Sequence, residues 1–296
     1  MNVGSSREAH GAAPPEPLPW AGPGGAGYPQ RIVCLTEEPT EVLYALDEAW
    51  RIVGISGFTV RPPRARREKP KVSAFTSARI DEILALCPDL VVGFSDIQAD
   101  IAQALVKRGV EVWIANHRTV DGIFSYVRRL GAMVGAAEKA EEYADLLEAR
   151  VAAVRSLGRS LARHPKVYFE EWDEPCISAI GWVSELVGIA GGEDIFPEKA
   201  ACAMGRDRIL ADPSEVVRRA PDIIVGSWCG KKFRPEKVAA RPGWGAIPAV
   251  RDGELHEVKS PLILQPGPAA LTDGLDALQA IVSRWAGRGD RCVIAA

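Results

Sequence analysis

The chain has 296 residues and the composition of an average globular protein, so it is long enough for two domains that each bury a core. A formal net charge of -3 gives no basic surface for nucleic acid, and no apolar run approaches the ~20 residues needed to cross a bilayer. We therefore expect neither a nucleic-acid partner nor insertion into a membrane.

Residues 1–30 are rich in Gly, Pro and Ala and carry little periodic apolar pattern, which predicts a disordered tail. They also lack the apolar core of a secretory signal, so the sequence as printed predicts a cytoplasmic protein. A periplasmic protein is the alternative if the true start lies upstream. Cysteines in the cytoplasm are reduced, and none is counted as a structural disulfide.

Strand-like and helix-like segments alternate through residues 31–136, which predicts an N-terminal α/β lobe. The strand-like segments are Arg31 to Leu35, Ile52 to Ile55, Leu90 to Gly93 and Val110 to Ile114. Between the second and third of these, residues 57–76 contain PPRARREKP and are expected to form an exposed basic loop.

Residues 137–164 are expected to form one long helix that links two lobes. Leu147, Val151 and Val154 lie at the three-and-four spacing of an apolar helical stripe. Acidic residues gather in the first turns and arginines in the last, as the helix dipole favours. Pro165 ends the helix, because the residue before a proline is disfavoured in helical geometry.

Residues 165–286 repeat the plan of the first half, and residues 287–296 form a second tail. The strand-like segments KVYFEEW and PDIIVGSW stand in the same order and at nearly the same spacing as RIVCLTEE and PDLVVGF before the helix. The sequence therefore predicts two Rossmann-like lobes with parallel sheets, joined by a single long helix. Ligands of such sheets lie beyond the carboxyl ends of the strands, so we expect the site in the cleft between the lobes.

Residues that follow the predicted strands are largely aromatic. An aromatic cleft with few charges suits a large, flat or partly apolar ligand better than a bare ion or an oxyanion, although each ring could instead cap the core of its own lobe. The predicted ligand-binding residues are Thr36, Glu37, Phe58, Phe75, Phe94, Trp172, Trp182, Trp228 and Gln265.

Metal-ligating residues are sparse and form no compact motif. His117 could ligate the metal of a bound chelate, or be a solvated loop histidine; Cys176, Cys202 and Cys229 could together bind a soft metal, or be small buried residues. No GxGxxG or Walker loop indicates a nucleotide, and no GxSxG elbow indicates a hydrolase. We expect a protein that is not an enzyme.

Five segments carry a family resemblance: RIVCLTEEPTEVLYAL, VSAFTSARIDEILALCPDLVVGF, WVSELVGIAGGEDIF, RPGWGAIPAVRDGELHEV and QPGPAALTDGL. They resemble the helical-backbone class (class III) of periplasmic binding proteins, most closely the cobalamin-binding proteins that serve ABC importers. The resemblance implies a cobalamin, or a related corrinoid or metal chelate, held between aromatic side chains. By position these are Phe58, Phe75 and Phe94 in the first lobe and Trp172 in the second.

Members of that class dock on an ABC permease through one acidic residue in each lobe. Asp81 matches the position in the first lobe, whereas Ser214 stands at the matching position in the second. Together with the predicted location, this favours a cytoplasmic corrinoid carrier or sensor. The alternatives are an importer receptor for cobalamin, haem or ferric siderophore, and a metal-handling or enzymatic protein that uses the second-lobe cysteines.

Overall fold

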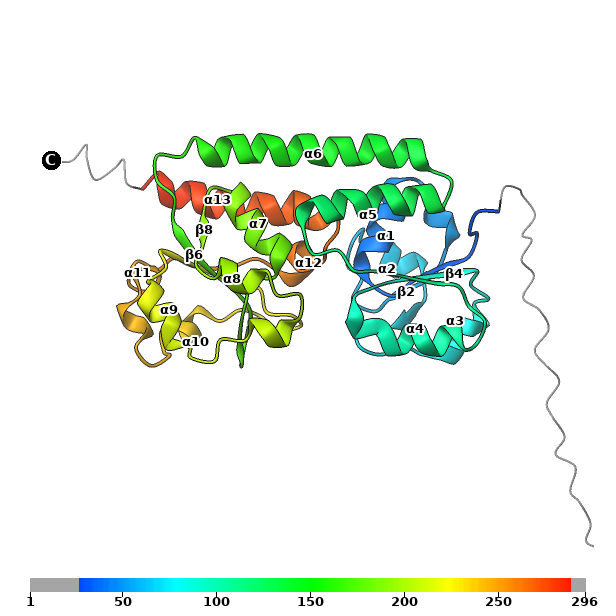
Figure 1. Ribbon diagram of the computed structural model, residues 1–296, viewed down its shortest axis with the longest axis horizontal. Coiled ribbons are helices and arrows are strands. Elements are labelled where there is room, and N and C mark those ends of the chain that lie inside the picture. The colour runs from blue at the N-terminus through cyan, green and yellow to red at the C-terminus, as the bar shows by residue number, and fades with distance from the viewer. Residues whose placement is uncertain (1–26, 289–296) are drawn as a thin grey trace, which may run out of the picture.

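The computed structural model describes residues 27–288, so the predicted tails lie almost entirely outside the described residues. Two α/β lobes lie side by side, and the long helix α6 (Ala137–Arg159) runs along one side of both (Figure 1). None of the described helices is long and apolar enough to span a membrane.

The first lobe is a five-stranded parallel sheet in the order β3-β2-β1-β4-β5. Buried apolar runs form its central strands, as expected for a sheet covered on both faces. Its strands are β1 (Ile32–Cys34), β2 (Ile52–Ser56), β3 (Lys71–Ser73), β4 (Leu90–Phe94) and β5 (Val112–Ala115). Its helices are α1 (Glu37–Ala45), α2 (Ala65–Glu68), α3 (Ile80–Ala85), α4 (Ala99–Val106) and α5 (Val120–Met133).

The second lobe has a sheet in the order β10-β9-β6-β7, with β8 also paired to β6. Its strands are β6 (Lys166–Asp173), β7 (Cys176–Ser178), β8 (Glu193–Asp194), β9 (Ile223–Gly226) and β10 (Leu255–Glu257). Its helices are α7 (Gly181–Ile189), α8 (Pro197–Ala200), α9 (Ser214–Arg219), α10 (Pro235–Ala239), α11 (Pro248–Arg251), α12 (Ser260–Ile263) and α13 (Leu275–Ala286), the last preceded by a π-helical turn at Ala270–Gly274.

Three local features differ from the sequence prediction. The segment 57–76 is not one exposed loop, because it contains α2 and the edge strand β3. Strand β6 continues through Asp173 and turns back as β7, an antiparallel pair within an otherwise parallel sheet. Helix α6 ends at Arg159 and not at His164. Gly158 lies directly against the backbone of α7 there, where a Cβ atom would stand 2.5 Å from the carbonyl oxygen of Ile189.

The two lobes share one hydrophobic core beneath α6. Val127 of α5, Leu147 of α6, Val183 of α7 and Leu278 of α13 belong to the same cluster of buried side chains. Because this core crosses the boundary between the lobes, it opposes a wide hinge movement.

A second-lobe segment, residues 264–273, reinforces this connection by lying against the first lobe. The imidazole Nε2 of His117 is 2.7 Å from the carbonyl oxygen of Pro266, and the Glu41 carboxylate accepts a hydrogen bond of 3.0 Å from the backbone N–H of Ala269. Arg61 pairs with Asp273 across the same contact between residues 264–273 and the first lobe, which forms a seam between the lobes. The lobes are therefore joined by this seam as well as by α6.

Candidate functional site

A cavity of about 340 Å³ lies between the lobes. Its walls come from segments beyond the carboxyl ends of strands in both sheets, as the switch-point rule for α/β sheets predicts. The lining residues are Phe75, Phe94, Ser95, Asp96, Ile97 and Arg118 from the first lobe and Glu171, Ile180, Trp182, Ala203, Met204, Gly205, Arg206, Arg208, Leu264 and Gln265 from the second.

Two aromatic rings from different lobes form the floor of this cavity. Phe94 ends β4 and Trp182 lies in the first turn of α7; their ring centroids are 6.2 Å apart in an edge-to-face arrangement. The indole N–H of Trp182 donates a 2.9 Å hydrogen bond to the carbonyl oxygen of Ile263, so this deeply buried side chain has its polar atom satisfied.

Four of the five charged side chains at the cavity wall form two ion pairs, one in each lobe; the fifth is Arg206. The Arg118 guanidinium is 3.3 Å from Asp96 and stands over the Phe94 ring, 4.7 Å from its centroid. Arg208, which is almost completely buried, pairs with Glu171 and also donates to the carbonyl oxygen of Ser178. The Nε atoms of Arg118 and Arg208 are buried without a hydrogen-bond acceptor.

Four of the nine predicted ligand-binding residues line the cavity together: Phe75, Phe94, Trp182 and Gln265. The binding of a ligand by these four remains a prediction. Arg118, Arg208, Glu171 and Met204 also line the cavity but were not predicted from the sequence. Arg118 was predictable, because it directly follows His117, which was already a candidate from its position after β5.

The other five predicted residues do not line this cavity. Phe58 is half exposed, and the Trp172 ring lies under the Lys231 ammonium, 4.0 Å from it. Trp228 turns back into the core of the second lobe, where its indole N–H donates to Glu170 at 3.0 Å. The Thr36 hydroxyl donates to Glu38 at 2.5 Å.

Glu37, the fifth of these residues, is buried with both carboxylate oxygens lacking a hydrogen-bond partner. Burial, assisted by the neighbouring charge of Glu38, raises the pKa of Glu37 to about 8. Glu37 therefore behaves as a neutral carboxylic acid at pH 7.

His117 is neither a solvated loop residue nor part of the cavity wall. Its ring stacks on Tyr126 with centroids 4.8 Å apart and meets the edge of Phe94 at 5.2 Å. Burial lowers its pKa to about 4, so the neutral imidazole occupies this position at pH 7 and donates its Nε2–H to Pro266. The environment of His117 is that of a packing residue and not of a metal ligand.

The second-lobe cysteines do not form the soft-metal site considered from the sequence. Cys176 is buried in β7, with its Sγ 3.4 Å from the carbonyl oxygen of Asp173, and burial raises its pKa to about 11. Cys202 is half-buried, whereas Cys229 is exposed. Within residues 27–288 no group of three His, Cys, Asp or Glu side chains is placed to hold a metal ion.

The cavity is equipped to bind a ligand by contact and hydrogen bonding. Apolar side chains dominate its wall, and the charged groups are the two arginine–carboxylate pairs together with Arg206. Among the lining residues no imidazole, thiol or phenol faces the cavity, and Met204 supplies the single sulfur atom.

The fold and the cavity define a two-lobed ligand-binding protein with a rigid connecting helix. A family model described as "Periplasmic binding protein" matches residues 32–262, and the chain belongs to this family. The resemblance drawn from the sequence is thereby confirmed.

Two relatives match across most of both chains. A Bacillus subtilis protein named as an uncharacterized ABC transporter substrate-binding lipoprotein is 22% identical over 84% of this chain and 79% of its own. A vitamin B12-binding protein of Vibrio parahaemolyticus is 22% identical over 82% of this chain and 86% of its own.

Solved structures share the same fold. A possible iron-binding protein from Staphylococcus epidermidis has a TM-score of 0.74 at 20% identity and covers 86% of this chain and 99% of its own. A periplasmic heme-binding protein from Roseiflexus reaches 0.72 at 23% identity, with the same coverage of 86% and 99%. The vitamin B12-binding protein of Vibrio cholerae reaches 0.69 at 20% identity, covering 87% and 98%. At identities of 20–23%, this structural likeness shows the shared architecture alone, which is two lobes and a long helix.

The cytoplasmic location predicted from residues 1–30 is wrong. The family consists of periplasmic binding proteins, and the Bacillus relative is a lipoprotein, so membership indicates a location outside the cytoplasm. The prediction failed because it rested on the composition of one terminal segment, whereas the family is recognised by the folded body. The cytoplasmic carrier or sensor fails with it.

Proposed function

We propose that this protein is the extracytoplasmic substrate-binding component of an ABC importer and that its ligand is a corrinoid such as cobalamin. The observation that carries the proposal is the pair of rings from opposite lobes, Phe94 and Trp182, at the floor of one shared apolar cavity. A flat macrocycle inserted above these rings would contact both lobes at once. The vitamin B12-binding relatives support the same ligand class.

The residues of the cavity wall favour a chelate whose metal needs no ligand from the protein. The corrin ring, its own nucleotide base and the upper ligand fill the coordination sphere of cobalt in cobalamin. A wall without imidazole, thiol or phenol groups suits such a ligand. The guanidinium groups of Arg118 and Arg208, which line the cavity, would donate to the carbonyl oxygens of peripheral amides.

Haem is the second candidate, and Met204 is the observation that favours it. A methionine thioether is an established axial ligand of haem iron, and Met204 lies on the cavity wall together with the two arginines that could receive propionates. The heme-binding neighbour of the same fold is consistent with this alternative.

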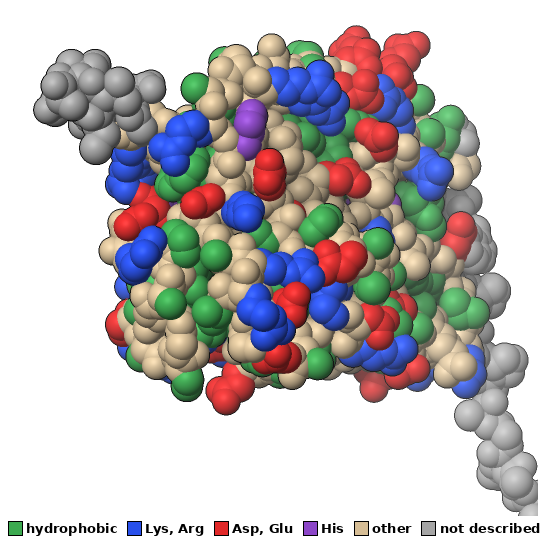
Figure 2. Space-filling view, turned by 60° about the vertical axis from the view of Figure 1, so that its left-hand side comes forward, with side chains coloured by type: hydrophobic (Ala, Val, Ile, Leu, Met, Phe, Trp, Pro, Cys, Tyr) green, Lys and Arg blue, Asp and Glu red, His purple; other side chains and the backbone are tan. Residues whose placement is uncertain are grey.

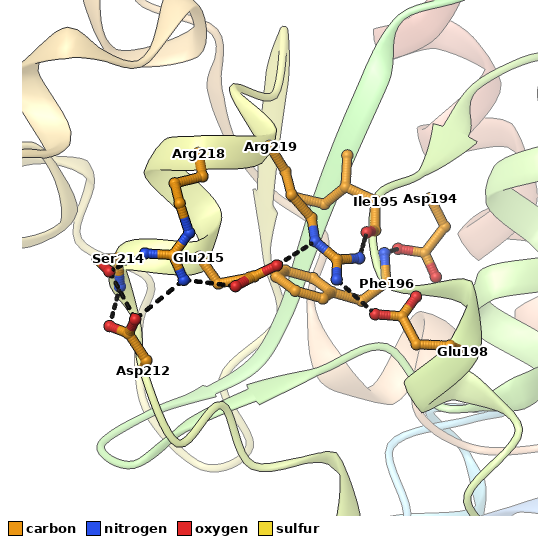
Figure 3. A network of polar contacts seen from close by, with 9 residues as sticks. All are labelled: Asp194, Ile195, Phe196, Glu198, Asp212, Ser214, Glu215, Arg218 and Arg219. Atoms are coloured by element: carbon orange, nitrogen blue, oxygen red, sulfur yellow. Dashed lines mark hydrogen bonds and ion pairs between the residues drawn. The ribbon is translucent and has the colours of Figure 1, made fainter.

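Docking on a permease would use acidic groups at the surface of each lobe. Asp81 is well placed in the first lobe, because its side chain is 91% exposed and, within residues 27–288, its only ion pair is a 3.4 Å contact with Arg108. In the second lobe the Ser214 hydroxyl donates a hydrogen bond to Asp212, and the Glu215 carboxylate forms ion pairs with Arg218 and Arg219 (Figure 3). We propose Asp81 as the principal docking acid. On the second lobe, Asp212 and Glu215 would take the corresponding role.

A titration with both chelates separates the candidates. Purified protein is mixed with cyanocobalamin and, separately, with haemin, and the heat of binding and the absorbance of each chromophore are followed. Saturable cyanocobalamin binding in the micromolar range or tighter supports the proposal. A Soret shift with haemin that is lost in Met204→Leu, without a response to cyanocobalamin, would replace it with haem.

A mixed surface charge is consistent with a small-molecule partner. On the face in Figure 2, basic and acidic side chains are interspersed and no extended basic patch appears. This face offers no stripe of positive charge for a nucleic-acid backbone.

A further inference from the structure

Gln98 ties together three chain segments of the first lobe behind the cavity. Its side chain is completely buried in the short 3-10 helix Asp96–Gln98 that follows β4. The Oε1 atom accepts a 2.9 Å hydrogen bond from the backbone N–H of Phe94. The Nε2 group donates to the carbonyl oxygen of Leu35 at 3.3 Å and to that of Phe75 at 3.2 Å.

The surrounding backbone is built to admit this carboxamide. A Cβ atom at Gly93 would stand 2.4 Å from Gln98 Oε1, so residue 93 has to be glycine while the amide keeps its place. Ser95 adopts a positive φ of 68° and its hydroxyl accepts from the N–H of Ile97, which turns the chain so that residue 98 points back beneath β4.

Two of the three segments held by Gln98 carry rings on the cavity wall. Phe94 is on the strand end, and Phe75 is on a turn that is otherwise closed by the 2.7 Å hydrogen bond from Ala74 N–H to Ser77 O. The Gln98 carboxamide thus joins the Phe75 turn to the end of β4 through two hydrogen bonds. Only a side chain with both a donor and an acceptor can make this connection.

We propose that Gln98 is a positioning residue that sets the spacing of the Phe75 and Phe94 rings and thereby the affinity of the cavity for its flat ligand. Gln98 does not contact the ligand, and this role rests on the proposed function. Replacing Gln98 keeps both aromatic side chains but lets the Phe75 turn move, so that the cavity wall has to be reordered during binding.

A double-mutant cycle tests the role. The dissociation constant for cyanocobalamin is measured for the wild type, Gln98→Met, Phe75→Ala and the combined variant. We expect Gln98→Met to weaken binding about tenfold in the wild-type background and about threefold or less when Phe75 is already absent, because the two act through one ring. Equal losses in both backgrounds would overturn the proposal.

Gln98→Glu serves as a second variant if Gln98→Met folds poorly. Glutamate keeps the acceptor for Phe94 N–H, but even when protonated it has one O–H donor where the amide has two N–H donors, so at least one of the bonds to Leu35 and Phe75 is lost. Its expected effect on the cycle is the same in sign. An affinity equal to that of the wild type would count against the role of the Nε2 bonds.

Amide hydrogen exchange in the absence of ligand tests the positioning independently of the ligand's identity. In Gln98→Met the protected N–H groups of Ala74 and Phe94 are expected to exchange at least about tenfold faster. Gln279→Met, which removes a side-chain hydrogen bond to Ser283 in α13, is the control and should leave both amides unchanged. Unaltered exchange at Ala74 and Phe94 in Gln98→Met would overturn the role of Gln98, whereas failure of the wild type to bind cyanocobalamin would overturn the proposed function alone.

Discussion

Phe94 and Trp182 meet edge to face with ring centroids 6.2 Å apart, although one ends a strand of the first lobe and the other opens a helix of the second. Both side chains are almost fully buried. The floor of the cavity is therefore assembled by the fold itself, and a ligand does not have to bring these rings together. A preformed floor lowers the ordering cost of binding and is consistent with the rigid seam between the lobes.

Phe75 and Phe58 form a matched pair that tests which aromatic residues bind the ligand. Phe75 lines the cavity, whereas Phe58 is 49% exposed outside it. We expect Phe75→Ala to weaken cyanocobalamin binding by about 1–2 kcal/mol, because apolar contact area with the ligand is lost. Phe58→Ala should change the affinity by less than about twofold. Calorimetric titration of both variants is the measurement, and a larger loss in Phe58→Ala would contradict this assignment of the site.

The burial of His117 predicts a loss of stability on mild acidification. Because its pKa is about 4 in the folded chain and 6.5 when unperturbed, the unfolded state takes up a proton below pH 6.5 that the folded state accepts only near pH 4. The contribution of His117 is present at pH 7 and falls by about 2 kcal/mol by pH 5. Urea unfolding at both pH values should show this difference between the wild type and His117→Gln. An identical pH dependence in the two proteins would show that the imidazole titrates normally.

The architecture could be predicted from the sequence because burial leaves a periodic record. The stripe of Leu147, Val151 and Val154 indicated α6, and all three side chains are buried in the shared core. The β6–β7 hairpin left no such record, since its turn at Glu174 and Pro175 resembles any loop that follows a strand.

The cavity could be predicted only in part, because the position after a strand identifies an edge of the sheet but not the direction of a side chain. Phe94 and Trp228 both follow this rule. The Trp228 ring nevertheless turns into the second-lobe core, where its N–H donates to Glu170, a residue far away in the sequence. Arg208 resembles a surface residue in the sequence and is buried by its contacts with Glu171 and Ser178, which arise only in the folded chain.

Arg61 tests the strength of the seam between the lobes. Its guanidinium pairs with Glu41, which is largely buried, and with Asp273 of the second lobe, whose side chain is 49% exposed. Arg61→Ala leaves the Glu41 carboxylate without its cation and should lower the free energy of unfolding by about 1–3 kcal/mol. Asp273→Ala should lower it by less than about 1 kcal/mol, because an exposed ion pair contributes little. Denaturant unfolding of both variants measures the two effects, and a larger effect of Asp273→Ala would mean that the contact between the lobes dominates.

Glu37 predicts a pH dependence of the opposite sign to that of His117. Burial raises the pKa of Glu37 to about 8 from its usual value of 4.5, so between these two pH values the folded chain keeps a proton that the unfolded chain releases. Its contribution is fully present below pH 4.5 and is lost as the pH rises through 8.

Glu37→Gln preserves the shape and the neutrality of this side chain. It should therefore flatten the decline in stability between pH 5 and pH 8.5 and make the variant about 1–3 kcal/mol more stable than the wild type at the higher pH. Glu82→Gln is the control, because Glu82 is exposed beside Arg79 and should follow the wild-type curve. Urea unfolding across this pH range is the measurement. If Glu37→Gln is less stable than the wild type at pH 8.5, the Glu37 carboxylate is ionised in the folded protein and is stabilised there by a hydrogen-bond or ion-pair partner.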